Sequence, residues 1–410
     1  MNVKKQIISI FILSLFISFC YYFLISKFII YPTVIPMISN GNTYLFADWQ
    51  VIIGSNLCRE LGYDVYLNNP CDPWGRKHVY GEILLYFPFV EKFQNFYFDI
   101  LPIFINYIFI VLVLTTFHFK NYITYLTPIV LLLSFPVILA IERAQLDLLI
   151  FILIVFLAYF KNKILNFIIL VFVTISKFYP IILSIIFFFE NKFKKVFIKF
   201  IIFIILISLI FFIQSEQIIK IYENKGQFLA FGIYDFSLVG TLKYLKNYYF
   251  LTNNKIYSFF MFLFLFVPSS IMFFKTIKYF SRTKTFYNLN YNFFEDRLYI
   301  FSSAIILVCY FSFHNYVYRE IFFIGLIPWV LKIKILDKDQ NFFSFFYYFL
   351  MFKFLISTPI AYVYMNKIFE PANPILLFFK YSIDLCLISL ILGVFLIFFI
   401  KSLNFLKKNI

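Results

Sequence analysis

Long apolar stretches, rich in phenylalanine, isoleucine and leucine, alternate along the chain with short polar segments. Many of these stretches exceed the ~18 apolar residues that a helix needs to cross a bilayer. With clusters of lysine marking the connections, the pattern predicts about twelve transmembrane helices. Their predicted ranges are 6–26, 97–118, 122–140, 146–160, 164–176, 178–190, 196–213, 256–274, 298–312, 319–333, 342–360 and 376–400. We therefore predict an all-α polytopic integral membrane protein, with one membrane domain over residues 1–410.

The composition supports this class and excludes soluble ones. Hydrophobic residues make up 63% of the chain and charged residues only 14%, whereas soluble domains are nearer half apolar and a quarter charged. The net charge of +16 comes mostly from lysines in the short connections between predicted helices. We therefore predict the lipid bilayer as a partner and no nucleic acid.

The lysines also predict an orientation. When the N-terminus is placed in the cytoplasm, the basic connections, such as Lys161–Lys163 and Lys192–Lys195, fall on the cytoplasmic side, as the positive-inside rule requires. This holds only if residues 164–190 cross the membrane twice, with a turn at Ser176–Pro180. Both termini are then cytoplasmic in an inner membrane. The acids and bases that interrupt the apolar runs are expected almost entirely on the outer side.

Two long polar segments, 27–96 and 214–255, are the predicted outer loops. Residues 47–61 of the first are weakly amphipathic with helical spacing, which favours a helix lying along the membrane interface and ending at Gly62. Cys58 and Cys71 share this loop. An oxidising compartment permits a disulfide between them, but spacing alone does not determine its geometry.

Asp48 stands at or near the start of this predicted helix. One interpretation is that its carboxylate caps the helix. The other is a general base held at the membrane surface. Further along the loop, Asp72, Arg76 and His78 accompany Trp74 and Tyr80. This set suits either recognition of a polar substrate, with the aromatic rings against a sugar, or anchoring at the interface.

A second predicted outer turn runs from Glu142 to Asp147. Glu142 and Gln145 are three residues apart, and Arg143 and Asp147 are four apart, so each pair would share a face of one helix. Asp147 lies at the start of an apolar run, where an unpaired carboxylate is costly. Either Arg143 pairs with Asp147, or Glu142 and Arg143 face the same cavity as Asp48.

Two further predicted outer turns carry bases. Lys177 is flanked by long apolar runs, and a buried ammonium requires a partner, which would be Asp147 or a lipid-borne phosphate. Arg319 begins another run, just after His314 and Asn315. An arginine in this position suits bidentate binding of phosphate, and His314 is either an acid/base group or a structural histidine.

Three local patterns resemble one family of membrane enzymes. Asp48, followed by Gly62-Tyr-Asp-Val-Tyr66, is similar to the loop of an Asp and a "G-x-x-x-Y" element in the family 87 mannosyltransferase-like group of the GT-C glycosyltransferases. Ala144-Gln-Leu-Asp147 resembles its "G-Q-x-N" turn, with Ala144 and Asp147 replacing Gly and Asn. Lys177-Phe-Tyr-Pro180 resembles its "K-x-x-P" turn.

The resemblance implies an inverting transferase that moves a hexosyl residue, such as mannosyl, from a polyprenyl-phosphate donor to a glycan or glycolipid on the outer face of the membrane. It implies Asp48 as the catalytic base and Lys177 as a contact to the donor phosphate. The other substrate-binding candidates are Glu142, Arg143, Gln145, Asp147, His314, Asn315 and Arg319. No cofactor is expected, no residue is assigned to a metal, and metal dependence is left open.

Two other functions fit a polytopic chain. A polysaccharide polymerase of the O-antigen type would rely on arginines in large outer loops, and this chain has six arginines in all. A flippase or transporter of lipid-linked sugars would need polar residues along a path through the membrane, whereas the pattern above predicts them outside.

Overall fold

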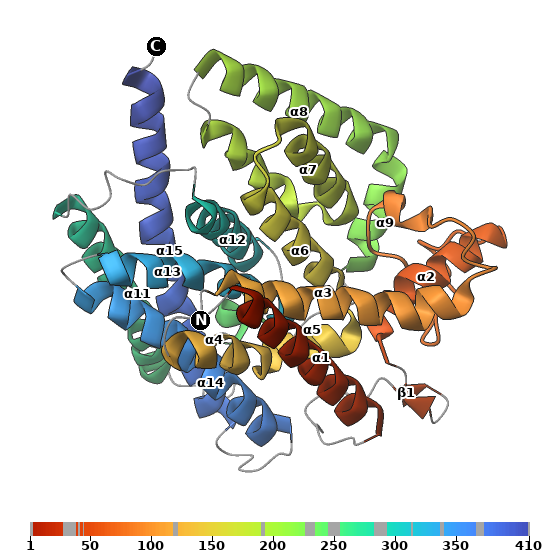
Figure 1. Ribbon diagram of the computed structural model, residues 1–410, viewed down its shortest axis with the longest axis horizontal. Coiled ribbons are helices and arrows are strands. Elements are labelled where there is room, and N and C mark those ends of the chain that lie inside the picture. Colours follow the sequence, from red (N-terminus) through yellow and green to blue (C-terminus); the bar gives the residue numbers. More distant parts are fainter. Residues whose placement is uncertain are drawn as a thin grey trace. The chain divides into compact units, whose positions relative to one another are not determined.

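A computed structural model describes residues 3–27, 38–39, 42–43, 45–117, 122–189, 193–225, 234–244, 255–282, 293–312, 315–336, 340–365 and 373–408. These residues are almost entirely helical, with one short hairpin that pairs β1 (Ile38–Ser39) with β2 (Asn42–Thr43) (Figure 1). The chain divides into two compact units. Unit 1 comprises residues 1–156, 162–178 and 206–228, and unit 2 comprises residues 157–161, 179–205 and 229–410.

Unit 1 is built around a buried helix that follows the hairpin. Its helices are α1 (Val3–Lys27), α2 (Ala47–Glu60), η1 (Glu82–Leu85), η2 (Phe96–Ile100), α3 (Leu101–Thr116), α4 (Tyr122–Leu132), α5 (Phe135–Arg143), most of α6 (Leu146–Tyr159), α7 (Lys163–Lys177) and α9 (Ser215–Lys225). The indole of Trp49 on α2 donates to the carbonyl of Tyr97 at 2.9 Å, and Asn56 donates to the carbonyl of Leu84 at 2.7 Å. These bonds satisfy buried polar groups and hold α2 against η1 and η2.

Unit 2 contains the three longest described helices, α11 (Lys255–Arg282), α14 (Gln340–Met365) and α15 (Asn373–Lys408). Its other helices are η3 (Tyr179–Phe189), the first part of α8 (Phe193–Ile213), α12 (Phe294–Phe311), η6 (Val317–Leu326) and α13 (Ile327–Leu336). Gly393 lets α15 approach α11 closely, because a Cβ there would lie 2.9 Å from Cγ2 of Thr276. The rings of Tyr299 and Phe398 contact Trp329, with centroids 4.2 and 5.5 Å from it.

The membrane class is confirmed at the level of helix length and composition. Among the described residues, four helices are long and apolar enough to cross a bilayer: Phe96–Thr116, Phe262–Ser281, Asn341–Ala361 and Ile375–Ile400. Two bent pairs raise the number to six if each is one span: Leu126–Leu132 with Phe135–Arg143, and Phe197–Ile213 with Ser215–Asn224. Each of the twelve predicted segments contains helix among its described residues, but several of these helices are too short to span by themselves.

The predicted helix over residues 47–61 is present as α2 and ends where expected, since Gly62 has φ +86. Ten of its fourteen residues are buried, so most of α2 packs inside unit 1. Its polar residues Ser55 and Asn56 are buried through hydrogen bonds to nearby groups. The location of α2 along the membrane interface stays a prediction.

Candidate functional site

The start of α2 brings Asp48 to a meeting point of several segments. Phe46, just before the helix, adopts φ 60 and donates its N–H to the carbonyl of Glu142 at 2.9 Å. Asp48 is the second residue of α2, and no side chain caps the helix. The capping interpretation is therefore wrong. The carboxylate of Asp48 instead bonds to side chains from distant segments.

Three donors surround the carboxylate of Asp48. Arg76 Nη1 lies 3.1 Å from Oδ1. Gln145 Nε2 donates to Oδ2, and Arg143 Nη1 lies 3.6 Å from the same oxygen. The Asp48 side chain is 13% exposed. It is thus partly desolvated, charge-paired and still accessible, a combination found at reactive carboxylates.

Gln145 links Asp48 to Lys177. While its amide nitrogen donates to Asp48, its Oε1 accepts from Lys177 Nζ at 3.3 Å. Lys177 Nζ also lies 2.5 Å from Oδ2 of Asp147 and 5.5 Å from the ring centroid of Tyr80. The sequence analysis offered Asp147 or a lipid-borne phosphate as the partner of Lys177, and in the structure Lys177 pairs with Asp147. The four residues form one connected polar network.

The turn between α5 and α6 explains this network. α5 ends at Arg143, Ala144 is left-handed with φ 44 and ψ 54, and α6 begins at Leu146. Arg143 and Asp147 therefore lie on different helices, and the prediction that they share one helix face is wrong. The break directs Arg143 to Asp48 and Asp147 to Lys177. Oε2 of Glu142, beside the break, is buried with no hydrogen-bond partner among the described residues.

A glycine sets the position of Tyr80 beside Lys177. The N–H of Gly81 donates to the carbonyl of Ser176 at 2.9 Å. A Cβ at Gly81 would lie 1.6 Å from the carbonyl oxygen of Ile175, so no other residue fits. α7 ends at Lys177 and Phe178 has φ 55, which confirms a sharp turn within residues 176–180.

His78 is excluded from substrate contact by burial. Its side chain is fully buried between the rings of Tyr66 and Tyr80, whose centroids lie 5.4 and 5.7 Å away. Burial lowers the pKa of His78 to about 3, so the imidazole is neutral at physiological pH. His78 therefore belongs to the packing beneath the Asp48 site.

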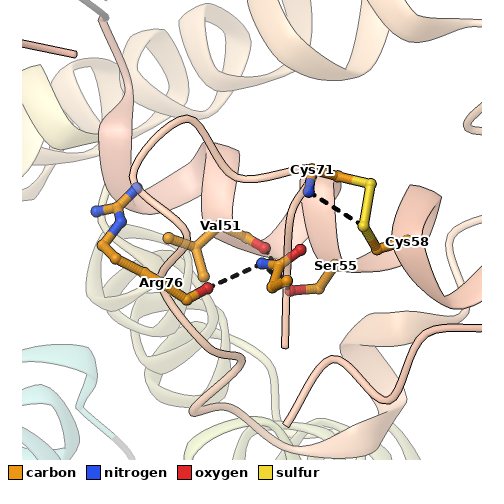
Figure 2. The surroundings of a disulfide bond; sticks show 6 residues. Val51, Ser55, Cys58, Cys71 and Arg76 are labelled. Carbon is orange, nitrogen blue, oxygen red and sulfur yellow. Dashed lines mark hydrogen bonds between the residues drawn. A yellow bond between two sulfur atoms is a disulfide. The ribbon is translucent and has the colours of Figure 1, made fainter. Parts of the chain in front are cut away.

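The loop that carries Arg76 is covalently joined to α2. Cys71 forms a disulfide with Cys58, with the two Cα atoms 5.7 Å apart. Figure 2 shows this bond on one side of the loop and Arg76 on the other. The side chain of Arg76 also forms a bidentate pair with Asp72, through Nε at 3.0 Å and Nη2 at 2.8 Å. The sequence left open whether Cys58 and Cys71 are bonded, and in the structure they form a disulfide.

The remaining predicted residues belong to unit 2. Asn315 is buried and structural, because its amide donates to the carbonyl of Cys309 and its own carbonyl accepts from the N–H of Phe236. Arg319 lies with its guanidinium carbon 4.8 Å from the ring centroid of Tyr179. His314 lies outside the described residues.

Unit 2 contains a charged cluster that the sequence analysis missed. Lys353 Nζ pairs with Oδ1 of Asp384 and lies 3.0 Å from Oε1 of Glu320. Lys380 Nζ lies 2.9 Å from Oδ2 of Asp384 and donates to the carbonyl of Asp235 at 2.5 Å. We name Glu320, Lys353, Lys380 and Asp384 the Lys353 cluster.

This cluster corrects the expectation that charges gather almost entirely outside the membrane. Lys353 lies within the candidate span Asn341–Ala361, and Lys380 and Asp384 lie within Ile375–Ile400. A signal was present in the sequence, since Lys380 and Asp384 are four residues apart in an apolar run, the spacing of an intrahelical ion pair. The prediction gave more weight to the surrounding apolar run than to this four-residue spacing.

Comparisons of the chain with protein-family models, with curated proteins and with solved structures give no match.

Proposed function

We propose that this protein is a membrane glycosyltransferase of the GT-C type. It transfers a hexosyl residue, such as mannosyl, from a polyprenyl-phosphate donor to a glycan or glycolipid acceptor on the outer face of the membrane. The observation that carries the proposal is the convergence of Arg76, Arg143 and Gln145 on the partly exposed carboxylate of Asp48 in a multi-span helical membrane protein.

The chemistry of transfer matches the groups present. The hydroxyl oxygen of the acceptor attacks the anomeric carbon, and the bond from that carbon to the phosphate oxygen breaks with its electron pair staying on the phosphate. Asp48 takes the proton of the hydroxyl, as a general base. A carboxylate accepts about four hydrogen bonds, so its present donors leave room for the acceptor. Attack opposite the leaving group inverts the anomeric centre.

The leaving phosphate requires positive charge. Arg143 and Lys177 are the candidates, because Arg143 pairs directly with Asp48, Gln145 connects Lys177 to Asp48, and neither cation is fully buried. Preorganised cations stabilise the charge that develops on the phosphate oxygens. In this proposal the buried Oε2 of Glu142 accepts a hydrogen bond from a sugar hydroxyl.

Backbone geometry supports the resemblance to the family 87 group. The position where that group prefers Gly is Ala144, and here its φ is 44, a conformation that glycine adopts most readily. The position where the group prefers Asn is Asp147, whose carboxylate pairs with Lys177 of the Lys-x-x-Pro turn. The two resembling turns thus contact each other.

The proposal includes a topology. We propose about twelve spans, cytoplasmic termini and an outer Asp48 site. The Cys58–Cys71 disulfide supports the outer side for the first loop, since disulfides persist in oxidising compartments.

Mass spectrometry of surface glycans and glycolipids from a deletion strain tests the proposal. The strain is complemented with wild type, with Asp48→Asn, or with Glu60→Gln as a matched control at the exposed end of the same helix. We expect one sugar to be missing, and to return with wild type and Glu60→Gln but not with Asp48→Asn. Full rescue by Asp48→Asn would show that Asp48 is not the general base. Complete but unpolymerised units would indicate a polymerase.

A flippase or transporter of lipid-linked sugars is the second candidate. The observation in its favour is the presence of Lys353, Lys380 and Asp384 inside candidate spans, because ionisable residues at that depth often mark a substrate path. Accumulation of the complete lipid-linked sugar on the inner leaflet of the deletion strain would favour this function over transfer.

A further inference from the structure

Arg76 is bound by the protein on several sides at once. Its Nε and Nη2 donate hydrogen bonds to the carboxylate of Asp72, and Nη2 also donates to the backbone carbonyl of Ala47 at 2.6 Å. The ring centroid of Trp74 lies 4.5 Å from the guanidinium carbon. These contacts leave Nη1 pointing at Oδ1 of Asp48, 3.1 Å away. A planar guanidinium held in this way has a fixed direction for its remaining donors.

The segment that carries Arg76 is itself fastened to α2. We name residues 69–76 the clamp loop. At one end, Cys71 is joined to Cys58 of α2, and Asn69 donates both to Oγ of Ser55 on α2 at 3.1 Å and to the carbonyl of Arg76 at 2.9 Å. Figure 2 shows Ser55 between the disulfide and Arg76. The clamp loop therefore runs beside α2 from the disulfide back to Asp48.

The backbones of loop and helix are also in direct contact. A Cβ at Gly54 would lie 2.9 Å from the carbonyl oxygen of Cys71. The glycine thus permits the loop to lie against α2 at this point, and a larger residue would push it away. Covalent, hydrogen-bonded and steric constraints all act on the same eight residues of loop.

The two oxygens of Asp48 consequently have different environments. Oδ1 faces Arg76, whose guanidinium uses four of its five N–H donors on protein acceptors. Oδ2 faces Gln145 and the more distant Arg143, which belong to the proposed substrate site. Arg76 is thus committed to protein acceptors, whereas the Nη1 of Arg143 lies 3.6 Å from Oδ2 on the side of the proposed substrate site.

We propose that Arg76 is a positioning residue, which the disulfide-tied clamp loop holds against Oδ1 of Asp48 so that Oδ2 faces the substrates. This inference rests on the proposed function, because it assigns Arg76 a role in that reaction. It differs from a role in binding the sugar or the phosphate directly.

Steady-state kinetics of sugar transfer, with protein in lipid nanodiscs, tests this role. Arg76→Gln is expected to lower kcat about 100-fold, a loss typical for a misplaced general base, with KM changed less than about twofold. Arg76→Lys is expected not to restore kcat, because one ammonium cannot reach Asp72, Ala47 and Asp48 together. Asp72→Asn, which keeps Arg76 but loosens it, is expected to lower kcat about 10-fold.

A double variant separates positioning from substrate binding. If Arg76 acts only through Asp48, Asp48→Asn with Arg76→Gln is no slower than Asp48→Asn alone. A further drop in the double variant, a large rise in KM with kcat unchanged, or full activity of Arg76→Gln would each overturn the inference. Alkylation of free thiols, followed by mass measurement, checks that each variant retains the Cys58–Cys71 bond and hence its local fold.

Hydrogen exchange gives a readout that does not depend on the reaction. Amides of residues 46–52 are expected to exchange about tenfold faster in Arg76→Gln than in wild type, because the start of α2 loses its contact at Ala47, and to be unchanged in Glu60→Gln. Unchanged exchange in Arg76→Gln would show that Arg76 does not hold the start of α2, and would overturn the inference. If Arg76→Gln exchanged faster but the wild type showed no transfer activity, the proposed function would be rejected, while the role of the clamp loop in holding α2 would stand.

Discussion

The two units each contain a network of acids and bases, and the networks differ in how their charges are held. In unit 1, the side chains of Asp48, Arg76 and Arg143 are 12–13% exposed and lie at helix ends and in a loop. In unit 2, Lys353 and Asp384 are 5% and 1% exposed and lie inside helices. Asp48, Arg76 and Arg143 thus keep a small exposed fraction, whereas Lys353 and Asp384 are paired with each other inside helices.

The difference bears on what substitutions in each network are expected to change. A buried ion pair contributes little net stability over apolar residues, but removal of one partner leaves an uncompensated charge. A partly exposed carboxylate can lose its charge at lower cost because water and neighbouring side chains compensate. We therefore expect substitutions in the Lys353 cluster to affect folding, and substitutions around Asp48 to affect activity.

The largest effect is expected at Lys353. Lys353→Met leaves Asp384 and Glu320 with less compensation in the interior and is expected to destabilise the protein by about 3–5 kcal/mol. Chemical unfolding in lipid nanodiscs measures the loss, with Lys278→Met at an exposed position as the control. A loss of stability no larger than that of Lys278→Met would contradict the expected difference between the Lys353 cluster and the Asp48 site.

The next effect concerns the disulfide. Replacing Cys58 and Cys71, which are 13 residues apart, by serine is expected to cost about 3 kcal/mol through the entropy of the unfolded loop. Cys20→Ser, at a half-buried free cysteine, is the control. Hydrogen exchange should rise in residues 47–81 and stay constant in α14 and α15. An equal rise in both units would show that the clamp loop is not a local constraint.

A pH dependence is expected from His78. Burial lowers the pKa of His78 to about 3 in the folded protein, against about 6.5 in the unfolded chain. As the pH falls below about 6.5, the unfolded state binds the proton first, so stability is lost progressively down to about pH 3. The loss at pH 5 is about 2 kcal/mol. His78→Phe should flatten this part of the stability curve, and an unchanged curve would contradict the assignment.

The smallest effect is the stability change in Asp48→Asn. We expect less than about 1 kcal/mol, because Arg76 keeps its pair with Asp72 and the site is partly exposed. Thermal unfolding beside Glu60→Gln measures it. If Asp48→Asn unfolded as readily as Lys353→Met, its loss of activity would no longer indicate catalysis.

Several features of the fold follow from local pattern. The all-α membrane class, the helix ending near Gly62 and the turn after Lys177 were all predictable, because apolar length, glycine and proline act on a few neighbouring residues. Lys177 was selected because long apolar runs flank it, and Asp48 because it stands at the start of the predicted loop helix and fits the family resemblance. The link between them through Gln145 was not predictable, since it joins residues 97 and 32 positions apart.

The sequence by itself determined that this is a membrane protein, that its segments are helical and which charged residues it contains, because these depend on composition and short-range periodicity. Only the tertiary structure decided which charges meet. The left-handed turn at Ala144 sends Arg143 and Asp147 to different partners, and the packing of α14 and α15 joins Lys353 to Asp384. Pairing energies depend on distance in space, and distances between remote residues are absent from a linear pattern.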